Sequence, residues 1–258
     1  MTSQDAARMP RRALLRLGLA GAGLAGAAAC GAAPTPGAPT TTAPRPSAPP
    51  STRPTLAPGA PAPEVERGTS GRPEVALTFH GAGDPVLAKK VLTALHDRGA
   101  AVTVLAVGTW LQQSPDSARV VTDLGHELGN HTWSHGDIDA MSESAARAEI
   151  ERCRDRIAAL TGGLGAFFRP SQAQHATSRV KVLAAAAGYP TVLSYDVDSR
   201  DFTDPGAATI RRNVAAAKAG AVVSMHLGHP GTLDAIPGLL DDLAARGLRP
   251  VTASKLFA

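Results

Sequence analysis

The sequence predicts an α/β fold for residues 73–258, with a parallel sheet that is either open or closed into a barrel. Short β-branched, apolar runs alternate with longer segments in which apolar residues recur at helical spacing. This alternation favours parallel strands joined by right-handed crossovers. Polar residues also follow several predicted strands directly, and in parallel α/β folds ligands bind where the strands end.

The strands are predicted from their short, apolar composition. Val75–Phe79 is the first and Val102–Val107 the second. His126–His135 is more polar and is predicted to be a strand that runs into a loop. Further short strands are predicted at Phe167-Phe168, Thr191–Tyr195, Ala221–His226 and Val251-Thr252.

Helix boundaries are indicated by proline and glycine. Pro85–Arg98 has a proline at its first position and Gly99 directly after its last. Ser142 starts a helix that continues to Leu160 and that Gly162-Gly163 ends. Further helices are predicted at Asp116–Leu124, Ser178–Ala187, Ala207–Lys218 and Leu233–Arg246.

Residues 1–29 have the features of an export signal. Arg11 and Arg12 precede an apolar, uncharged run from Leu17 to Ala29. This run is shorter than the ~20 residues that a membrane-spanning helix needs. The stretch Arg11-Arg12-Ala13-Leu14-Leu15 resembles a twin-arginine export signal.

Cys30 follows three alanines, and this junction resembles a bacterial lipobox, although Ala27 stands where such motifs usually have leucine. Cys30 would then become the lipidated first residue of the mature chain and anchor it to the membrane. Cleavage and release without lipidation is the alternative. A lipidated Cys30 leaves Cys153 without a disulfide partner, and we expect Cys153 to be a small core residue.

Residues 30–72 are predicted to be a disordered linker. Gly31–Glu66 contains eleven of the chain's 21 prolines and almost no large apolar side chains. The net charge of +4 lies mostly before Cys30, so the mature chain is nearly neutral, and its few aromatic residues form no stacking platform. We therefore exclude a nucleic-acid partner.

Several segments that are far apart in the sequence place polar residues at predicted strand ends. We expect these residues to meet at one site, because the carboxyl ends of parallel strands lie on one face. They are His80, Arg169, Asp198, Asp201 and His226. His131 and His135 are four residues apart, so a helical turn or a tight loop would aim both imidazoles the same way, at a spacing typical of zinc ligands.

These motifs resemble the polysaccharide deacetylase family, also called the NodB-homology or carbohydrate esterase family 4 enzymes. Gly125–His135 is similar to the family motif G-H-E-x-G-N-H-[ST]-x-x-H, and the resemblance extends over residues 73–258. Shorter matches are Val75–Phe79, Phe168-Arg169-Pro170, Asp198–Phe202 and Ser224-Met225-His226. The resemblance implies a distorted (β/α) barrel and metal-dependent removal of N- or O-acetyl groups from glycans.

The resemblance also implies roles for individual residues. His131 and His135 would bind a divalent metal, with zinc expected, and His226 would be the general acid. Asp198 or Asp201 would orient His226. Arg169 would brace a catalytic carboxylate, and a backbone N–H after it, on Gln172, would face the oxyanion.

The first family motif, T-F-D-D-G, differs here, because the same register gives Thr78-Phe79-His80-Gly81-Ala82. The family's general base and third metal ligand are both missing from their places. Three replacements are open: His80 acts as the base, His80 is a third imidazole ligand, or Asp84 supplies a ligand oxygen. Asp84 also fits an N-cap before Pro85.

Aromatic residues are candidates for the sugar-binding cleft. The family's R-x-P-Y tyrosine is replaced here by Ser171-Gln172, which leaves Trp133, Phe202 and Tyr195 to stack on a ring or to pack in the core. We predict a monomeric, lipid-anchored envelope enzyme that deacetylates a cell-wall or extracellular glycan. The alternative is a non-catalytic glycan-binding protein on the same fold.

Overall fold

The structure is a computed structural model, and it describes residues 56–258. The predicted export signal, Cys30 and most of the predicted linker lie outside these residues. Among the helices of the described part, none combines the length and the apolarity that crossing a bilayer requires.

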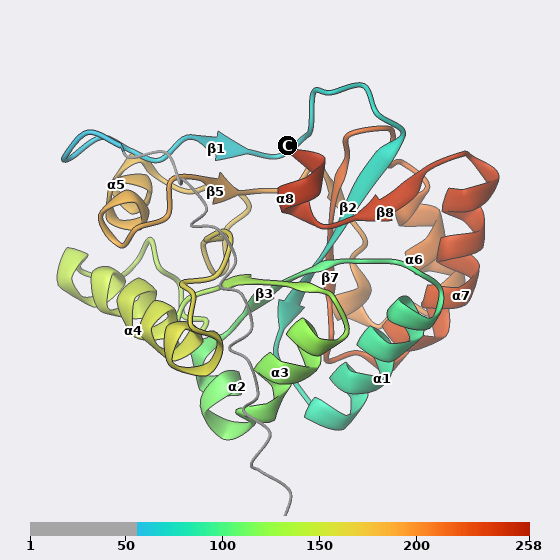
Figure 1. The fold of residues 1–258 in the computed structure, drawn as a ribbon, viewed down its shortest axis with the longest axis horizontal. Helices are drawn as coiled ribbons and strands as arrows, with labels where there is room; N and C mark the ends of the chain where they lie inside the picture. Colours follow the sequence, from blue (N-terminus) through green and yellow to red (C-terminus); the bar gives the residue numbers. More distant parts are fainter. Residues whose placement is uncertain (1–55) are drawn as a thin grey trace, which may run out of the picture. The chain divides into compact units, whose positions relative to one another are not determined.

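The centre of the domain is a parallel sheet with strand order β4-β3-β2-β7-β6, and β8 also pairs with β2 (Figure 1). Most of the sheet residues are buried, and the strands are apolar over most of their length. The strands are β2 (Glu74–Gly81), β3 (Thr103–Ala106), β4 (Glu127–Asn130), β6 (Val197–Asp198), β7 (Val222–His226) and β8 (Arg249–Val251).

A second, two-stranded sheet closes the other side of the domain. β1 (Glu64–Val65) pairs in parallel with β5 (Val192–Leu193). Single parallel bridges at Phe168 connect this pair to the main sheet, one to Asn130 at the end of β4 and one to Val192. An antiparallel bridge between Arg67 and Ala221 joins the segment after β1 to the residue before β7. The strands therefore form a closed, distorted barrel, which confirms the predicted α/β barrel class.

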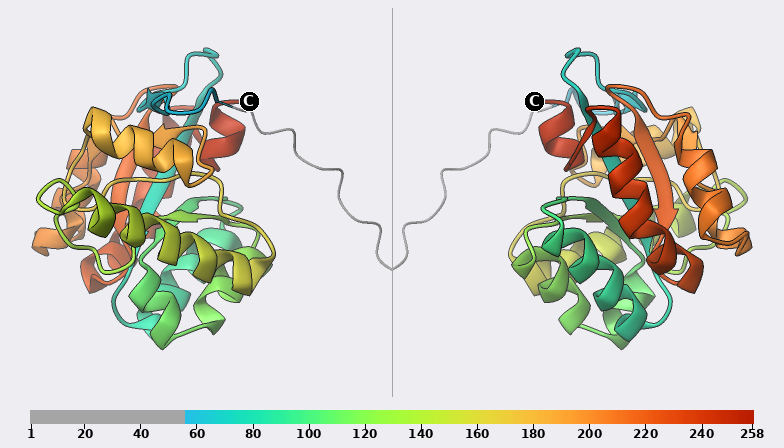
Figure 2. Two further views of the ribbon diagram at one scale, coloured as in Figure 1. Left: turned by 90° about the vertical axis from the view of Figure 1, so that its left-hand side faces the viewer. Right: turned by 90° about the vertical axis from the view of Figure 1, so that its right-hand side faces the viewer.

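The helices lie outside the strands (Figures 1 and 2). Helices α1 and α7 contact each other, as do α6 and α7, while α4 contacts α2, α3 and α5. The helices are α1 (Pro85–Asp97), α2 (Gly108–Gln113), α3 (Asp116–Asp123), α4 (Glu143–Thr161), α5 (Ser178–Ala186), α6 (Ala207–Val214), α7 (Pro230–Ala245) and α8 (Ala253–Leu256), with the 3₁₀ turn η1 (Asp201–Thr203).

The predicted capping residues define helix ends in the structure. Asp84 caps α1 by accepting a hydrogen bond from Val86 N, and Pro85 is the first helical residue. Ser142 caps α4, which ends at Gly162 with a φ of 78°. A positive φ at this position favours glycine over any residue with a side chain, so the sequence alone locates the end of α4.

The folded domain begins earlier than predicted. β1 lies within residues 30–72, which the sequence predicts to be a disordered linker, and Ala62 is only 1% exposed. Pro63 accepts a hydrogen bond from Val192 N, and Val65 accepts one from Ser194 N. A proline cannot donate to a sheet, but its carbonyl can accept, so a Pro-rich segment can still form an edge strand.

Smaller differences concern element boundaries. α7 begins at Pro230, three residues before the predicted start, because the proline fits the first helical turn. Phe167-Phe168 is not a full strand, although Phe168 makes the two bridges described above. α6 ends at Val214 rather than at Lys218. The helix α2 and the short strand β6 were not predicted.

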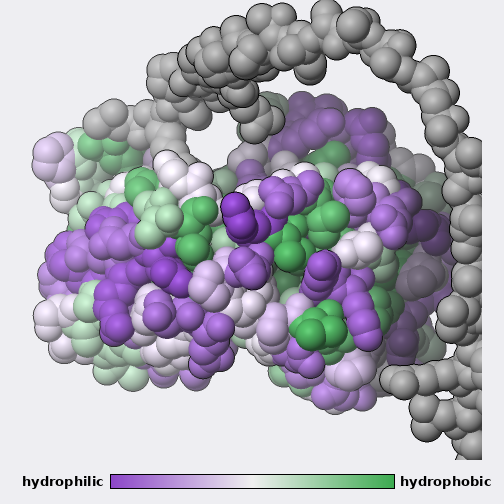
Figure 3. Space-filling model, turned by 60° about the horizontal axis from the view of Figure 1, so that its bottom comes forward, coloured by the Kyte–Doolittle hydropathy of each residue, from purple (hydrophilic) through white to green (hydrophobic). Residues whose placement is uncertain are grey.

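The arrowhead of β2 in Figure 1 points to the bottom of the view, and β7 pairs with β2 in parallel, so the carboxyl ends of the strands face that side. Figure 3 brings this side forward and shows hydrophobic side chains in separate patches among hydrophilic ones. The polar residues predicted at the strand ends belong to this part of the domain.

Candidate active site

Three histidines meet at the carboxyl ends of β2 and β4, two strands that are separated by β3 in the sheet. His80 lies near the end of β2, directly beside His226 of β7 in the sheet register, and His131 and His135 follow β4. One ring nitrogen from each of His80, His131 and His135 lies within 4.8 Å of the others. The ring centroids of His80 and His131 are 4.1 Å apart, and those of His131 and His135 are 4.8 Å apart.

The pair His131 and His135 is brought together by a tight loop and not by a helical turn. Thr132 and His135 have left-handed backbones, with φ of 67° and 61°. The loop is held by Asn130 Oδ1, which accepts from Thr132 N at 2.8 Å, and by Thr132 Oγ1, which accepts from His135 N at 3.2 Å. Non-glycine residues in this conformation are strained and cluster at functional sites.

His131 is oriented for a ligand. Its Nδ1 lies 3.1 Å from the carbonyl oxygen of Arg169, and because a carbonyl only accepts, Nδ1 carries the proton. Its Nε2 then has a lone pair, is buried, and has no hydrogen-bond partner among the described residues. Metal-binding histidines commonly donate their second N–H to a backbone carbonyl in this way.

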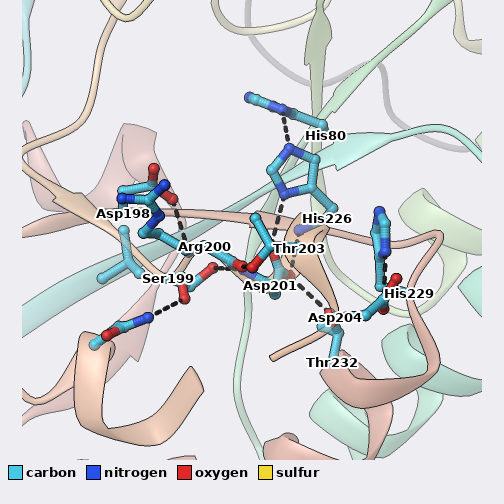
Figure 4. A network of polar contacts seen from close by, with 12 residues as sticks. His80, Asp198, Ser199, Arg200, Asp201, Thr203, Asp204, His226, His229 and Thr232 are labelled. Carbon is cyan, nitrogen blue, oxygen red and sulfur yellow. Dashed lines mark hydrogen bonds and ion pairs between the residues drawn. The ribbon is translucent and has the colours of Figure 1, made fainter. Parts of the chain in front are cut away.

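His80 is the first member of a chain of hydrogen bonds that continues through His226 to Asp201. Its Nδ1 lies 2.9 Å from Nε2 of His226, and Nδ1 of His226 lies 2.7 Å from Oδ1 of Asp201. The other oxygen of Asp201 accepts from the backbone N of His226 and from Thr232 Oγ1. Figure 4 shows His80, His226 and Asp201 in line, with Thr232 beneath the carboxylate.

Burial sets the charge state of the cluster. It lowers the pKa of His80 and of His131 well below the usual value, and the neighbouring imidazoles lower both further. Both rings are thus neutral near neutral pH, as metal binding requires. Burial raises the pKa of Asp201, but hydrogen bonds from His226 and Thr232 outweigh this, so its pKa is lowered overall.

Arg169 is fully buried beside the cluster without a carboxylate partner among the described residues. Its guanidinium donates to the carbonyl oxygens of Leu193 and Ser194, and Nη1 lies 3.4 Å from His80 Nε2. Burial lowers the pKa of Arg169 to about 9. Arg169 is therefore part of the site, but it braces backbone carbonyls and not the catalytic carboxylate that the resemblance implies.

Asp84 does not contribute to the histidine cluster. It is exposed, and its side chain caps α1 through Val86 N. Gly81, at the place of the family's second aspartate, is buried in β2 and paired with Ala106. A Cβ at Gly81 would lie 2.9 Å from Val104 Cγ1 and 3.0 Å from Trp110 Cζ3, so this position faces the packed interior.

Two further predicted site residues lie elsewhere. Asp198 accepts a hydrogen bond from Arg200 N, and it is Asp201 that contacts His226. Trp133 packs over Gly108, which has no room for a Cβ, and under the Arg152 guanidinium at 4.2 Å from its ring centroid. Its ring lies between α2 and α4 and is not among the residues that line the pocket described below.

A pocket of about 350 Å³ opens over the histidines. Gln172 and Phe202, two of the residues predicted to bind substrate, line it together with His80, His135, Pro170, Gln174, Tyr195 and His226. Gln172 has a φ of 56° and donates through Nε2 to the carbonyl oxygen of His135. Sequence reasoning missed Gln174 and Thr232. Only Thr232 had a weak signal, as a polar residue at the start of an apolar helix.

Comparison with known proteins gives concordant results. A family profile described as polysaccharide deacetylase matches residues 67–192. A peptidoglycan-N-acetylglucosamine deacetylase from Bacillus cereus is 32% identical over 197 residues, covering 71% of this chain and 87% of that protein.

Solved structures share the fold. A family 4 carbohydrate esterase from Streptomyces lividans in complex with acetate is 29% identical with a TM-score of 0.65, covering 69% of this chain and 91% of that one. A CE4 family pseudoenzyme from Bacillus anthracis is 23% identical with a TM-score of 0.70, covering 78% of this chain and 69% of that one. At that identity the similarity concerns the fold alone.

Proposed function

Because this chain belongs to the polysaccharide deacetylase family, we propose that it is a metal-dependent hydrolase that removes acetyl groups from a cell-wall or extracellular glycan. The observation that supports this most directly is the cluster of His80, His131 and His135 beneath the pocket. Membership of the family makes the substrate class an acetylated glycan, as in the deacetylases that this chain resembles.

The donor set fits a zinc ion. It consists of three neutral imidazoles, one of which presents a buried Nε2 that lacks a partner. Three protein ligands with an open fourth position are typical of catalytic zinc sites. When bound, such an ion polarises a carbonyl and lowers the pKa of water. Of the three replacements left open by the sequence, the geometry favours His80 as the third ligand.

The chain's own residues provide the rest of the site. Tyr195 and Phe202 line the pocket and would contact the faces of a sugar ring. The left-handed backbone of Gln172 belongs to the segment that follows Arg169, and we assign its N–H to the oxyanion. Gln172 also fixes the loop that holds His135 through its carboxamide.

The proposed location is the outer face of the cell membrane. It rests on the signal-like residues 1–29 and on Cys30 as a lipidated anchor, with the Pro-rich segment as a spacer. We propose that the protein is a monomer there. Mass spectrometry of the mature N-terminus tests the anchor: a diacylated Cys30 is expected, and an unmodified N-terminus would indicate release.

The test of the proposed function is metal content together with acetate release. We expect about one zinc per purified protein, lost on substitution His131→Ala, and acetate release from an acetylated oligosaccharide that a chelator abolishes and zinc restores. A folded protein with neither property would support the second candidate, a non-catalytic glycan-binding protein. The observation that favours this candidate is the absence of both family aspartates from the end of β2.

A further inference from the structure

The hydrogen bonds of His80 decide which of its nitrogens can bind a metal. A neutral imidazole has one N–H and one lone pair. His80 Nδ1 is 2.9 Å from His226 Nε2, so the nitrogen available to a metal is Nε2, where an ion would take the lone pair that now accepts from Nη1 of Arg169 at 3.4 Å. If Nε2 binds the metal through its lone pair, Nδ1 must carry the proton and donate it to His226.

The same count of protons and lone pairs then determines which nitrogen of His226 carries its proton. Its Nε2 accepts from His80, so its own proton is on Nδ1, where Asp201 Oδ1 accepts it at 2.7 Å. Every donor and acceptor along the line from His80 to Asp201 is thus matched in one direction (Figure 4). In this arrangement His226 has no N–H left over for a substrate.

The reverse arrangement does not allow a metal at His80. If His226 carried a proton on Nε2, His80 Nδ1 would have to accept it, and the His80 proton would move to Nε2. That nitrogen lies 3.4 Å from Nη1 of Arg169, which is also a donor, and it would have no lone pair for a metal. His226 therefore cannot both hold His80 as a ligand and donate a proton to a leaving group.

We propose that His226 and Asp201 are positioning residues that hold His80 as the third metal ligand, and that the site consequently hydrolyses sugar acetyl esters in preference to acetamides. This inference rests on the proposed function. It differs from the general-acid role that the resemblance gives to His226, because here the place of the family's first aspartate is taken by an imidazole that occupies His226 Nε2.

The preference for esters follows from the leaving groups. In ester hydrolysis the oxygen of water adds to the acetyl carbon, the bond from that carbon to the sugar oxygen breaks, and the products are acetate, the sugar hydroxyl and a proton. A sugar oxygen can leave with its electron pair and take up a proton afterwards. An amine nitrogen must be protonated before its bond to carbon breaks, so an acetamide needs a general acid.

The pocket offers no ready substitute for that acid. The carboxamides of Gln172 and Gln174 do not ionise. Tyr195 has a hydroxyl, but burial raises its pKa further, so it is a weak acid near neutral pH. His229 forms a similar pair with Asp204, at 3.1 Å, but it does not line the pocket.

The first test measures zinc affinity by competition with a chelator. We expect His226→Ala to weaken zinc binding about 10- to 100-fold, as loss of such a hydrogen-bond partner does in other metal sites. His226→Gln should recover much of this loss, because its carboxamide oxygen can accept the N–H of His80. His229→Gln is the matched control and should change the affinity less than about twofold.

Thermal unfolding of the metal-free proteins shows whether each variant is folded, and if His226→Ala is not, His226→Gln and the wild type give the comparison. A His226→Ala protein that is folded and binds zinc as tightly as the wild type would refute the positioning role. Imidazole ¹⁵N spectra of the zinc-loaded protein give an independent readout: His226 should carry its proton on Nδ1, and a proton on Nε2 would also refute the positioning role.

The second test compares acetate release from O-acetylated xylo-oligosaccharide and from chitooligosaccharide by the zinc-loaded protein. We expect kcat/KM to be at least about 100-fold higher for the ester. Equal or faster release from chitooligosaccharide would overturn the ester preference and leave the proposed function intact. Absence of release from both substrates by zinc-loaded protein would instead refute the proposed function, while zinc affinity would still decide the positioning role.

Discussion

The ends of β4 and β2 supply the two halves of the histidine cluster, and they differ in how they relate to the family. The end of β4 follows the family motif and holds His131 and His135 in a loop with left-handed residues. The end of β2 has His80 and Gly81 where the family has two aspartates. The motif therefore predicts the ligands at the end of β4 directly, but it does not predict those at the end of β2.

The end of β2 differs from the family pattern by more than the absence of two carboxylates, because its own residues fill the space and make new contacts. Gly81 packs closely against Val104 and Trp110, so the space for a second carboxylate is filled by the core. His80 makes the hydrogen bond to His226 that links the cluster to Asp201. At the positions of the two family aspartates, this chain therefore has the imidazole of His80 and the apolar contact of Gly81.

The largest effect is expected when a carboxylate is returned to this half. Gly81→Asp should destabilise the protein by about 3–5 kcal/mol, because its side chain would clash with Trp110 and Val104 and bury an unpaired charge. The measurement is urea unfolding of the metal-free protein. Gly163→Asp is the control, since nothing lies within 4 Å of a Cβ at Gly163, and it should cost less than about 1 kcal/mol. A stable Gly81→Asp protein with raised zinc affinity would mean that the β2 end had only lost a ligand.

The next comparison asks whether the two halves contribute equally to metal binding. His131→Ala and His80→Ala should each weaken zinc binding by more than about 100-fold, because two imidazoles alone hold zinc poorly. His96→Ala, at an exposed helix position, is the control. Isothermal titration with zinc gives the affinities. If only His131→Ala has an effect, His80 is not a ligand and the β2 half acts in some other way.

The sequence predicted the β4 half better because its information is local. The spacing of His131 and His135, the cap at Asp84 and the glycine after α4 each depend on a few neighbouring residues. By contrast, the hydrogen bond between His80 and His226 joins residues that are 146 positions apart in the sequence. The contact of Gly81 with Trp110 depends on how α2 packs. Pairings of this kind follow from the closed sheet and not from any local pattern.

Trp133 and Asp198 lie outside the predicted contacts for the same reason, since tertiary packing decides where their side chains point. Trp133 belongs to the motif segment, but its ring turns toward Arg152 and α2, which only the tertiary structure determines. Asp198 and Asp201 were equivalent candidates from their spacing, and the turn η1 aims Asp201 at His226. Chemistry could therefore be predicted from residue types and spacing, whereas assigning the roles required the geometry.

The stability of the metal-free protein should depend on pH because three of its histidines are buried. Burial lowers the pKa of His80, His131 and His126, so the unfolded chain binds protons near pH 6.5 that the folded, metal-free protein does not. Stability should be unaffected by these groups above about pH 6.5 and fall as the pH drops below it, by up to ~1.4 kcal/mol per pH unit per histidine. Urea unfolding from pH 7.5 to 5 gives the slope, and His131→Gln should make it shallower. An unchanged slope would show that the His131 imidazole is protonated in the folded protein.

The smallest effect is expected at Phe202, which lines the pocket but is not one of the three clustered histidines. Phe202 is 44% exposed, and its ring centroid lies 5.2 Å from that of His226, so one of its faces is open to a ligand. Phe202→Ala should raise KM for an acetylated oligosaccharide about 5- to 10-fold, which corresponds to about 1 kcal/mol of lost ring contact, with little change in kcat. Trp133→Phe, which alters a ring outside the pocket, should leave KM unchanged. If Trp133→Phe raised KM and Phe202→Ala did not, the sugar would bind on the β4 side of the site, and the pocket above His80 would not be the substrate cleft.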